Sequence, residues 1–241
     1  MPDQSTASDT STAPELGDGK GLSPSTCSPF LDLRLGDCME LMAQYPDNHF
    51  DLAIVDPPYG IGMSGGNVGY KGNNDLARKE WDKEPPPPEY FAEMMRVSKN
   101  WIVWGANYFL PMWPTRSFVL WNKGAGFQGR TYAEGELAAT SFDRNAQVWT
   151  YDPLAGRDYV GRIHPSQKPV KLYAWLMDQY AEKGQKMLDT HLGSGSIAIA
   201  AHYAGIHLTA CEIDSDYFEE ACARIERETR QMDFFSENSS C

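Results

Sequence analysis

Apolar segments of strand character alternate with helical segments at both ends of the chain. Near the N-terminus, residues 30–35 alternate apolar and polar side chains, and residues 50–55 form a nearly continuous apolar run; both patterns are typical of strands. In the last third, residues 186–188 and 207–211 have the same character and are flanked by helical patterns. Strands that alternate with helices build a mostly parallel sheet with helices on both faces, so we expect an α/β fold.

The other predicted elements fill the chain between these strands. Helices are predicted over 38–43, 89–97, 169–181, 197–204 and 216–230, and further strands over 101–105, 118–121, 136–141 and 147–151. Between 60 and 88, six glycines and a proline run replace any periodicity, which predicts a long loop of the kind that is often functional. The loop carries Lys71, Arg78, Lys79 and Lys83, so it is either a mobile flap at the mouth of a site or an inserted surface loop.

Length and composition predict one large domain with short tails. The chain has 241 residues, of which 41% are hydrophobic, enough for a single α/β core. Residues 1–29 are rich in Ser, Thr and Pro, so we expect a disordered tail there, a domain over 30–230, and a flexible tail over 231–241. There is no long apolar run and no signal-peptide pattern, so we expect neither a membrane span nor secretion but a cytoplasmic protein.

The cysteines, the histidines and the distribution of charge indicate which bonds and ligands to expect. The five cysteines form no Cys-x-x-Cys pair, and the five histidines show no ligand spacing, so we expect neither a disulfide framework nor a metal site. The net charge of -12 weighs against a nucleic-acid partner, but residues 116–171 hold eight basic and five acidic residues. A locally positive face is compatible with that distribution, so charge neither supports nor excludes DNA.

A glycine-bearing turn follows the strand at 186–188. Its residues 189–196 include Gly193 and Gly195, and Glu212 follows Gly193 by 19 positions at the end of the next strand. Such glycines let the backbone approach a nucleotide-like ligand, and an acid about 20 residues further on binds ribose hydroxyls. By itself the pattern is equally compatible with a tight strand-to-helix turn and a surface Glu.

The apolar strand at 50–55 runs directly into Asp56-Pro57-Pro58-Tyr59. The prolines fix the backbone, so the Asp56 carboxylate and the Pro57 carbonyl are held as neighbouring acceptors. Two acceptors suit an NH2 group, and the Tyr59 ring suits a planar base. The alternative is a rigid turn with a packed Tyr. A third segment, residues 164–169 (His-Pro-Ser-Gln-Lys-Pro), would alone be a turn that caps a helix.

Together and in this order, the three segments resemble the amino-group DNA methyltransferases, most closely the circularly permuted β-type, in which the catalytic motif precedes the cofactor motif. The resemblance covers about residues 31–230, and residues 118–123 are similar to a later strand motif of that family. One segment departs from it: the family has Asp-Pro-Phe where this chain has Asp189-Thr190-His191. His191 would then form the wall that the family's Phe provides.

The resemblance implies a Rossmann-like fold that binds S-adenosyl-L-methionine. By that resemblance Glu212 holds the ribose, Asp37 the adenine edge, and Lys168 with the turn at 193–195 the methionine end. The full set of cofactor contacts it implies is Asp37, Asp56, Lys168, Asp189, Thr190, His191, Gly193, Ser194, Gly195, Glu212 and Ile213.

The catalytic residues it implies are Asp56, Pro57, Pro58 and Tyr59, with Tyr59 stacking on a base flipped out of double-stranded DNA. Adenine N6 is favoured over cytosine N4 because Asp begins the motif. We expect a monomer or homodimer acting in restriction–modification, with a small target-recognition region within about 122–162. The alternatives are a cytosine-N4 enzyme, an RNA or protein-amide methyltransferase, and a non-catalytic subunit that binds S-adenosylmethionine.

Overall fold

The protein is described here by a computed structural model that covers residues 28–62, 82–109 and 116–237, with side chains as far as Arg230. Residues 1–27, and with them nearly all of the predicted N-terminal tail, lie outside this range. So do Lys71, Arg78 and Lys79 of the predicted flap. Within the described residues, no helix is both long and apolar enough to cross a membrane.

The described residues form an eight-stranded sheet with the order β1-β8-β7-β2-β3-β5-β4-β6. The strands are β1 (Leu31–Leu35), β2 (Leu52–Val55), β3 (Trp101–Trp104), β4 (Phe118–Asn122), β5 (Gly135–Thr140), β6 (Gln147–Thr150), β7 (Lys186–Asp189) and β8 (His207–Glu212). Only β5 runs against its neighbours, β3 and β4, whereas the other paired strands are parallel. The sheet is therefore mostly parallel, as predicted.

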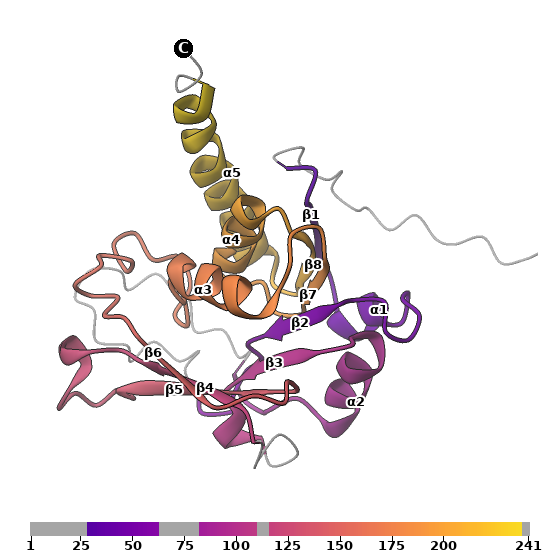
Figure 1. Cartoon of the computed structure of the whole chain (residues 1–241), viewed down its shortest axis with the longest axis horizontal. Coiled ribbons are helices and arrows are strands. Elements are labelled where there is room, and N and C mark those ends of the chain that lie inside the picture. Colours follow the sequence, from indigo (N-terminus) through magenta and orange to yellow (C-terminus); the bar gives the residue numbers. More distant parts are fainter. Residues whose placement is uncertain (1–27, 63–81, 110–115, 238–241) are drawn as a thin grey trace, which may run out of the picture.

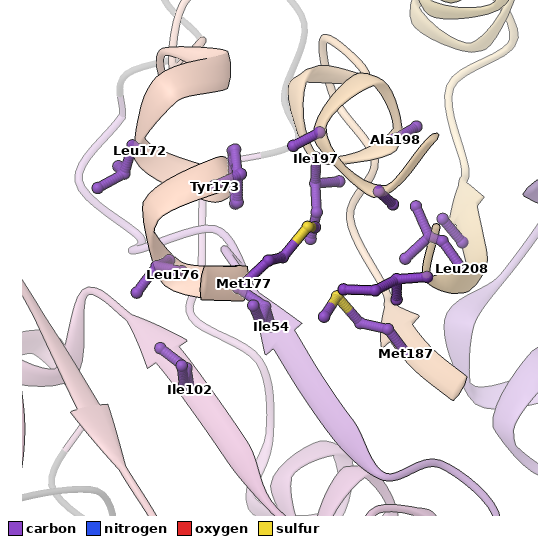
Figure 2. Packing of buried hydrophobic residues seen from close by; sticks show 14 of the residues in the cluster. Ile54, Ile102, Leu172, Tyr173, Leu176, Met177, Met187, Ile197, Ala198 and Leu208 are labelled. Carbon is purple, nitrogen blue, oxygen red and sulfur yellow. The ribbon is translucent and has the colours of Figure 1, made fainter. Parts of the chain in front are cut away.

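Helices cover both faces of the sheet (Figure 1). The helices are α1 (Cys38–Met42), α2 (Pro88–Val97), α3 (Val170–Tyr180), α4 (Ser196–Ala204) and α5 (Ser215–Glu237). Alternate residues of a strand point to opposite faces: Ile54 packs in the core beneath α3 and α4, whereas Val55 packs in the core beneath α1 and α2. Figure 2 shows Leu176 and Met177 of α3 above Ile54 and Ile102. This two-faced core confirms the predicted α/β architecture.

One predicted boundary differs from the structure. The last helix, predicted to end at residue 230, continues to Glu237, so the tail predicted from 231 begins as helix. Apolar residues continue at Met232, Phe234 and Phe235, and no Gly or Pro gives a stop signal there. Target recognition within about 122–162 stays a prediction; that range contains β5 and β6 of the sheet and the loops 123–134 and 151–162.

The parallel strands bring the predicted motifs to one edge of the sheet. Asp56 follows β2, the turn at 190–195 follows β7, and Glu212 ends β8. β7 and β2 are neighbours in the sheet. From β7 the chain continues to β8 on one side of this pair, and from β2 it continues to β3 on the other side. Such a switch point opens a crevice at the carboxyl ends of the strands, where open α/β sheets bind ligands.

Candidate active site

Two cavities adjoin at this crevice, with volumes of about 430 and 280 Å³. They share part of their lining, namely Asp56, Pro58, Ser166, Gln167 and Lys168. Three of these residues belong to the segment 164–169, which leads into α3. Groups bound in the two cavities would therefore meet at Asp56 and Lys168.

The smaller cavity is built around Glu212, which is 9% exposed. Its Oε2 accepts a hydrogen bond from the Gly193 amide at 2.9 Å, and its Oε1 accepts one from the Asp214 amide at 3.1 Å. Burial raises the pKa of Glu212, and the two amide donors oppose that rise. Ile213, which is 66% exposed, lines the same cavity. The cavity thus has a carboxylate next to an apolar side chain.

His191 lines the smaller cavity and is linked to the protein interior through two hydroxyl groups. Its Nδ1 lies 2.9 Å from the Thr190 Oγ1, which lies 2.6 Å from the buried Tyr90 hydroxyl of α2. The Tyr90 ring also meets the His191 ring edge-on, with centroids 5.5 Å apart. Burial lowers the pKa of His191 to about 4, against the charge of Asp37, so its ring is neutral at neutral pH.

Four of the predicted cofactor residues do not line this cavity. Asp37 caps α1, where its Oδ1 accepts from the Met39 and Glu40 amides. Asp189 is 3% exposed and accepts from the His191 amide at 3.0 Å; burial raises its pKa to about 8. Thr190 and Gly195 are also absent from the lining. The other seven predicted cofactor residues do line the cavity: His191, Gly193, Ser194, Glu212 and Ile213, together with Asp56 and Lys168.

Sequence reasoning assigned no site role to several residues that line the smaller cavity, among them His164, Tyr173 and Tyr217. His164 packs edge-on against Tyr217 with ring centroids 4.4 Å apart, and its Nδ1 accepts from the Ser166 amide at 3.3 Å. The His-Pro-Ser-Gln-Lys-Pro motif was the available signal for His164, whereas nothing local marks the aromatic residues of α3 and α5.

The larger cavity contains the whole Asp56-Pro57-Pro58-Tyr59 segment. Asp56 Oδ1 accepts a hydrogen bond from the Tyr59 hydroxyl at 2.6 Å, and Asp56 Oδ2 forms an ion pair with the Lys168 ammonium. Burial raises the pKa of Asp56, and the Lys168 charge opposes the rise. The Tyr59 ring stacks on Tyr108 with centroids 4.9 Å apart, so one aromatic partner of Tyr59 is supplied by the protein itself.

A chain of alternating charges continues from Asp56 into the wall of the larger cavity. Lys168 Nζ lies 3.1 Å from Glu136 Oε2, and Lys123 Nζ lies 2.6 Å from Glu136 Oε1. Burial by itself raises the pKa of Glu136, but the two ammonium groups outweigh it and hold that pKa at about 2. Glu136 lies at the start of β5. No sequence pattern marks it, because its partners Lys123 and Lys168 come from other parts of the chain.

Two loops form the outer wall of the larger cavity. Phe127 and Arg130 come from the loop after β4, and Tyr159 and Arg162 come from the loop after β6. Asp152 joins the loops: its Oδ2 accepts from the Gly126 amide at 2.8 Å. The Arg162 guanidinium lies 5.2 Å from the Tyr159 ring centroid. Among the described residues, no group of three or more His, Cys, Asp or Glu side chains is placed to hold a metal ion.

Comparisons with known proteins agree with this geometry. Residues 130–223 match the family model of the N6/N4 DNA methylases. YubD of Escherichia coli (strain K12), named as a methylase, is 24% identical over 213 residues that cover 82% of this chain and 91% of YubD. These matches confirm the resemblance to the N6/N4 DNA methylases that the sequence motifs indicate. The type II methyltransferase M.ScaI of Streptomyces caespitosus is 23% identical, and the match covers 82% of each chain.

Solved structures share the fold of this protein. The complex of M1.HpyAVI with SAM has a TM-score of 0.56 at 15% identity, and the match covers 80% of this chain and 99% of that chain. The cytosine-N4-specific PvuII DNA methyltransferase has a TM-score of 0.52 at 12% identity, with 85% and 94% of the two chains covered. These likenesses confirm the predicted Rossmann-like fold of S-adenosylmethionine-dependent methyltransferases.

Proposed function

We propose that this protein transfers a methyl group from S-adenosylmethionine to the exocyclic amine of a base flipped out of double-stranded DNA, with adenine N6 as the favoured target. The observation that carries the proposal is the junction of the two cavities. Asp56 and Lys168 line both of them, so a methyl donor in one cavity and an amine in the other would meet beside the same carboxylate.

The smaller cavity fits S-adenosylmethionine. Glu212 offers a carboxylate to ribose hydroxyls, Ile213 offers an apolar surface to the adenine ring, and Gly193 lets the backbone approach the ligand. When bound, the cofactor supplies a methyl group on a sulfonium that is already electrophilic. M1.HpyAVI and a DNA modification methylase of Thermus thermophilus have each been crystallised with this cofactor.

The larger cavity fits the acceptor base. Asp56 and the Pro57 carbonyl can accept hydrogen bonds from an NH2 group, which favours a pyramidal nitrogen and stabilises the positive charge that develops on it. Tyr59, held by Asp56 and Tyr108, presents a preorganised aromatic edge or face to the base. Adenine is favoured because the motif begins with Asp.

Methyl transfer can be tested with labelled S-adenosylmethionine and unmethylated plasmid DNA, followed by digestion to nucleosides and mass spectrometry. We expect N6-methyladenine as the product. The Asp56→Ala variant should retain the fold and cofactor binding and lose methyl transfer by about a thousandfold or more, because its carboxylate acts chiefly on the transition state.

Each alternative gives a different result in this assay. N4-methylcytosine would replace the adenine assignment, and methyl transfer to RNA but not to DNA would replace the substrate class. Cofactor binding without any transfer would identify a non-catalytic subunit. Sequencing of methylated bases in DNA from cells that express the protein would then give the recognition sequence.

A further inference from the structure

Asp56 already has a hydrogen-bond or ion-pair partner on each carboxylate oxygen. Oδ1 accepts from the Tyr59 hydroxyl, and Oδ2 is paired with the Lys168 ammonium. Under the proposed function, on which this inference rests, an incoming NH2 group needs one of these oxygens. A carboxylate oxygen can accept two hydrogen bonds, so the NH2 group either shares an oxygen with its present partner or displaces that partner. Where it displaces Lys168 from Oδ2, the ammonium needs another counter-charge.

The Lys168 ammonium cannot separate from Asp56 unless another negative charge pairs with it. Its side chain is 3% exposed, so water does not solvate the ammonium, and a buried ammonium without a counter-charge is strongly unfavourable. The carboxylates within ion-pair distance of Lys168 among the described residues are Asp56 and Glu136. The Trp104 ring, 5.3 Å from Lys168 Nζ, adds a weaker cation–π contact.

Glu136 has the properties needed to keep Lys168 paired while Asp56 turns to the base. Its Oε2 lies 3.1 Å from Lys168 Nζ, and its Oε1 is held by Lys123 at 2.6 Å. Glu136 lines only the larger cavity, beside the proposed place of the base. Lys123 holds the carboxylate in position from the end of β4.

We propose that Glu136 is a positioning residue: it retains the Lys168 ammonium when the target amine takes over Asp56 Oδ2, with Lys123 holding Glu136 in place. An ammonium has three N–H donors, so Lys168 can shift its bonding from two carboxylates to one without becoming unpaired. In this step no proton is transferred, and no covalent bond forms or breaks. Glu136 thereby lowers the cost of docking the base without touching the reacting atoms.

The Glu136→Gln variant tests this role, because an amide retains the shape of the side chain and removes its charge. Asp56 is then the one protein carboxylate left within ion-pair distance of Lys168 among the described residues, beside the methionine end of the cofactor, so the base must compete with Lys168 for Asp56. Phosphate contacts dominate DNA affinity, so we expect KM for DNA to change little while kcat falls about tenfold or more. A fluorescent analogue of the target base in duplex DNA should show correspondingly less flipping.

A second variant separates this role from a simple effect of net charge. Asp56, Glu136, Lys123 and Lys168 together are neutral, and Glu136→Gln leaves an excess positive charge near the proposed sulfonium site. The double variant Lys123→Met/Glu136→Gln restores neutrality but not the second carboxylate, so we expect it to remain as slow as Glu136→Gln. Recovery of wild-type kcat in the double variant would overturn the proposal in favour of charge balance.

Controls cover folding and the dependence on the proposed function. S-adenosylmethionine affinity of each variant should stay within about threefold of wild type, because Glu136 lies outside the smaller cavity. Should Glu136→Gln unfold, Glu136→Asp retains the charge but is too short to reach both lysines, and we expect kcat to fall about threefold or more. If the wild-type enzyme is active and either variant equals it in kcat and base flipping, the role of Glu136 is refuted. If the wild-type enzyme itself is inactive, the proposed function is refuted.

Discussion

At the scale of single residues, His191 departs most from the resemblance that the sequence motifs carry, which has Phe at this position. Burial lowers the pKa of its ring to about 4. Because the Thr190 hydroxyl meets Nδ1 and the Tyr90 ring meets the His191 ring edge-on, the imidazole is held as a neutral aromatic wall. We therefore propose that this neutral ring forms the cavity wall that the resemblance assigns to Phe.

This role predicts how substitutions at His191 affect cofactor binding. His191→Phe should keep S-adenosylmethionine affinity within about threefold of wild type, whereas His191→Ala should lose about tenfold or more with the buried ring. Since the imidazole gains its proton only below about pH 4, the affinity should show no His191 titration between about pH 6 and 8. Calorimetry measures both effects. Equal losses in the Phe and Ala variants would mean that a ring nitrogen makes a required contact.

The site could be predicted from sequence only where short motifs mark it. Asp56, Gly193 and Glu212 lie in or beside the segments that the resemblance indicated, and each lines a cavity. Glu136 and Tyr108 carry no local signal, because what they contact comes from distant parts of the chain. The predicted contact of Asp37 with the adenine edge stays a prediction, since an acid after a strand serves equally well as a helix cap.

At the scale of elements, the start of α4 is shaped by the packing of α5. Gly195 has a φ of +74°, and a Cβ there would lie 2.8 Å from Ile225 Cδ1 and 2.9 Å from Ile225 Cγ1. Ile225 belongs to α5 and is buried. Glycine at this position therefore allows the close packing of α5 as well as the left-handed turn.

Gly195→Ala should destabilise the protein by about 2–4 kcal/mol, the sum of left-handed strain and overpacking. Gly184→Ala is a matched control, because Gly184 has a φ of +85° and a methyl group added there would have no atom within 4 Å. That variant should lose only about 1 kcal/mol. Urea denaturation compares the two, and equal losses would show that α5 moves aside without cost.

The elements themselves were largely predictable, whereas their arrangement was not. Apolar runs such as residues 50–55 gave β2, and helical periodicity gave α3 nearly to the residue. The order of strands in the sheet depends on pairings such as Leu31 with Leu208, which no local pattern encodes. The resemblance supplied the Rossmann-like fold, but not the placement of β5 between β3 and β4.

At the scale of the whole molecule, the proposed function requires an acidic protein with a net charge of -12 to hold DNA at a local basic surface. Arg130 and Arg162 lie in the outer wall of the larger cavity, where the backbone of a flipped nucleotide would pass. Because the overall charge repels DNA, we expect a few such contacts to provide much of the affinity.

Arg130→Ala/Arg162→Ala should weaken DNA binding and reduce the slope of log affinity against log salt concentration by about 2, or close to one per lost phosphate contact. Arg227→Ala is the control: it removes one positive charge from α5, where the side chain is 64% exposed and lines neither cavity. Fluorescence anisotropy at several salt concentrations measures the slopes. If the control and the double variant lose similar slope, the arginines act through overall charge alone.

The pairing of β1 with β8 has a consequence for how the chain is made. Leu31 pairs with Leu208 and Leu35 with Glu212, so β1 meets β8 only after the long stretch of chain between them has left the ribosome. Until then the leucine side chains of β1 lack their partner strand, a situation that slows folding and favours aggregation. During synthesis, the protein is therefore most vulnerable in the interval before β8 emerges, and its yield in cells should depend on chaperones that act on nascent chains.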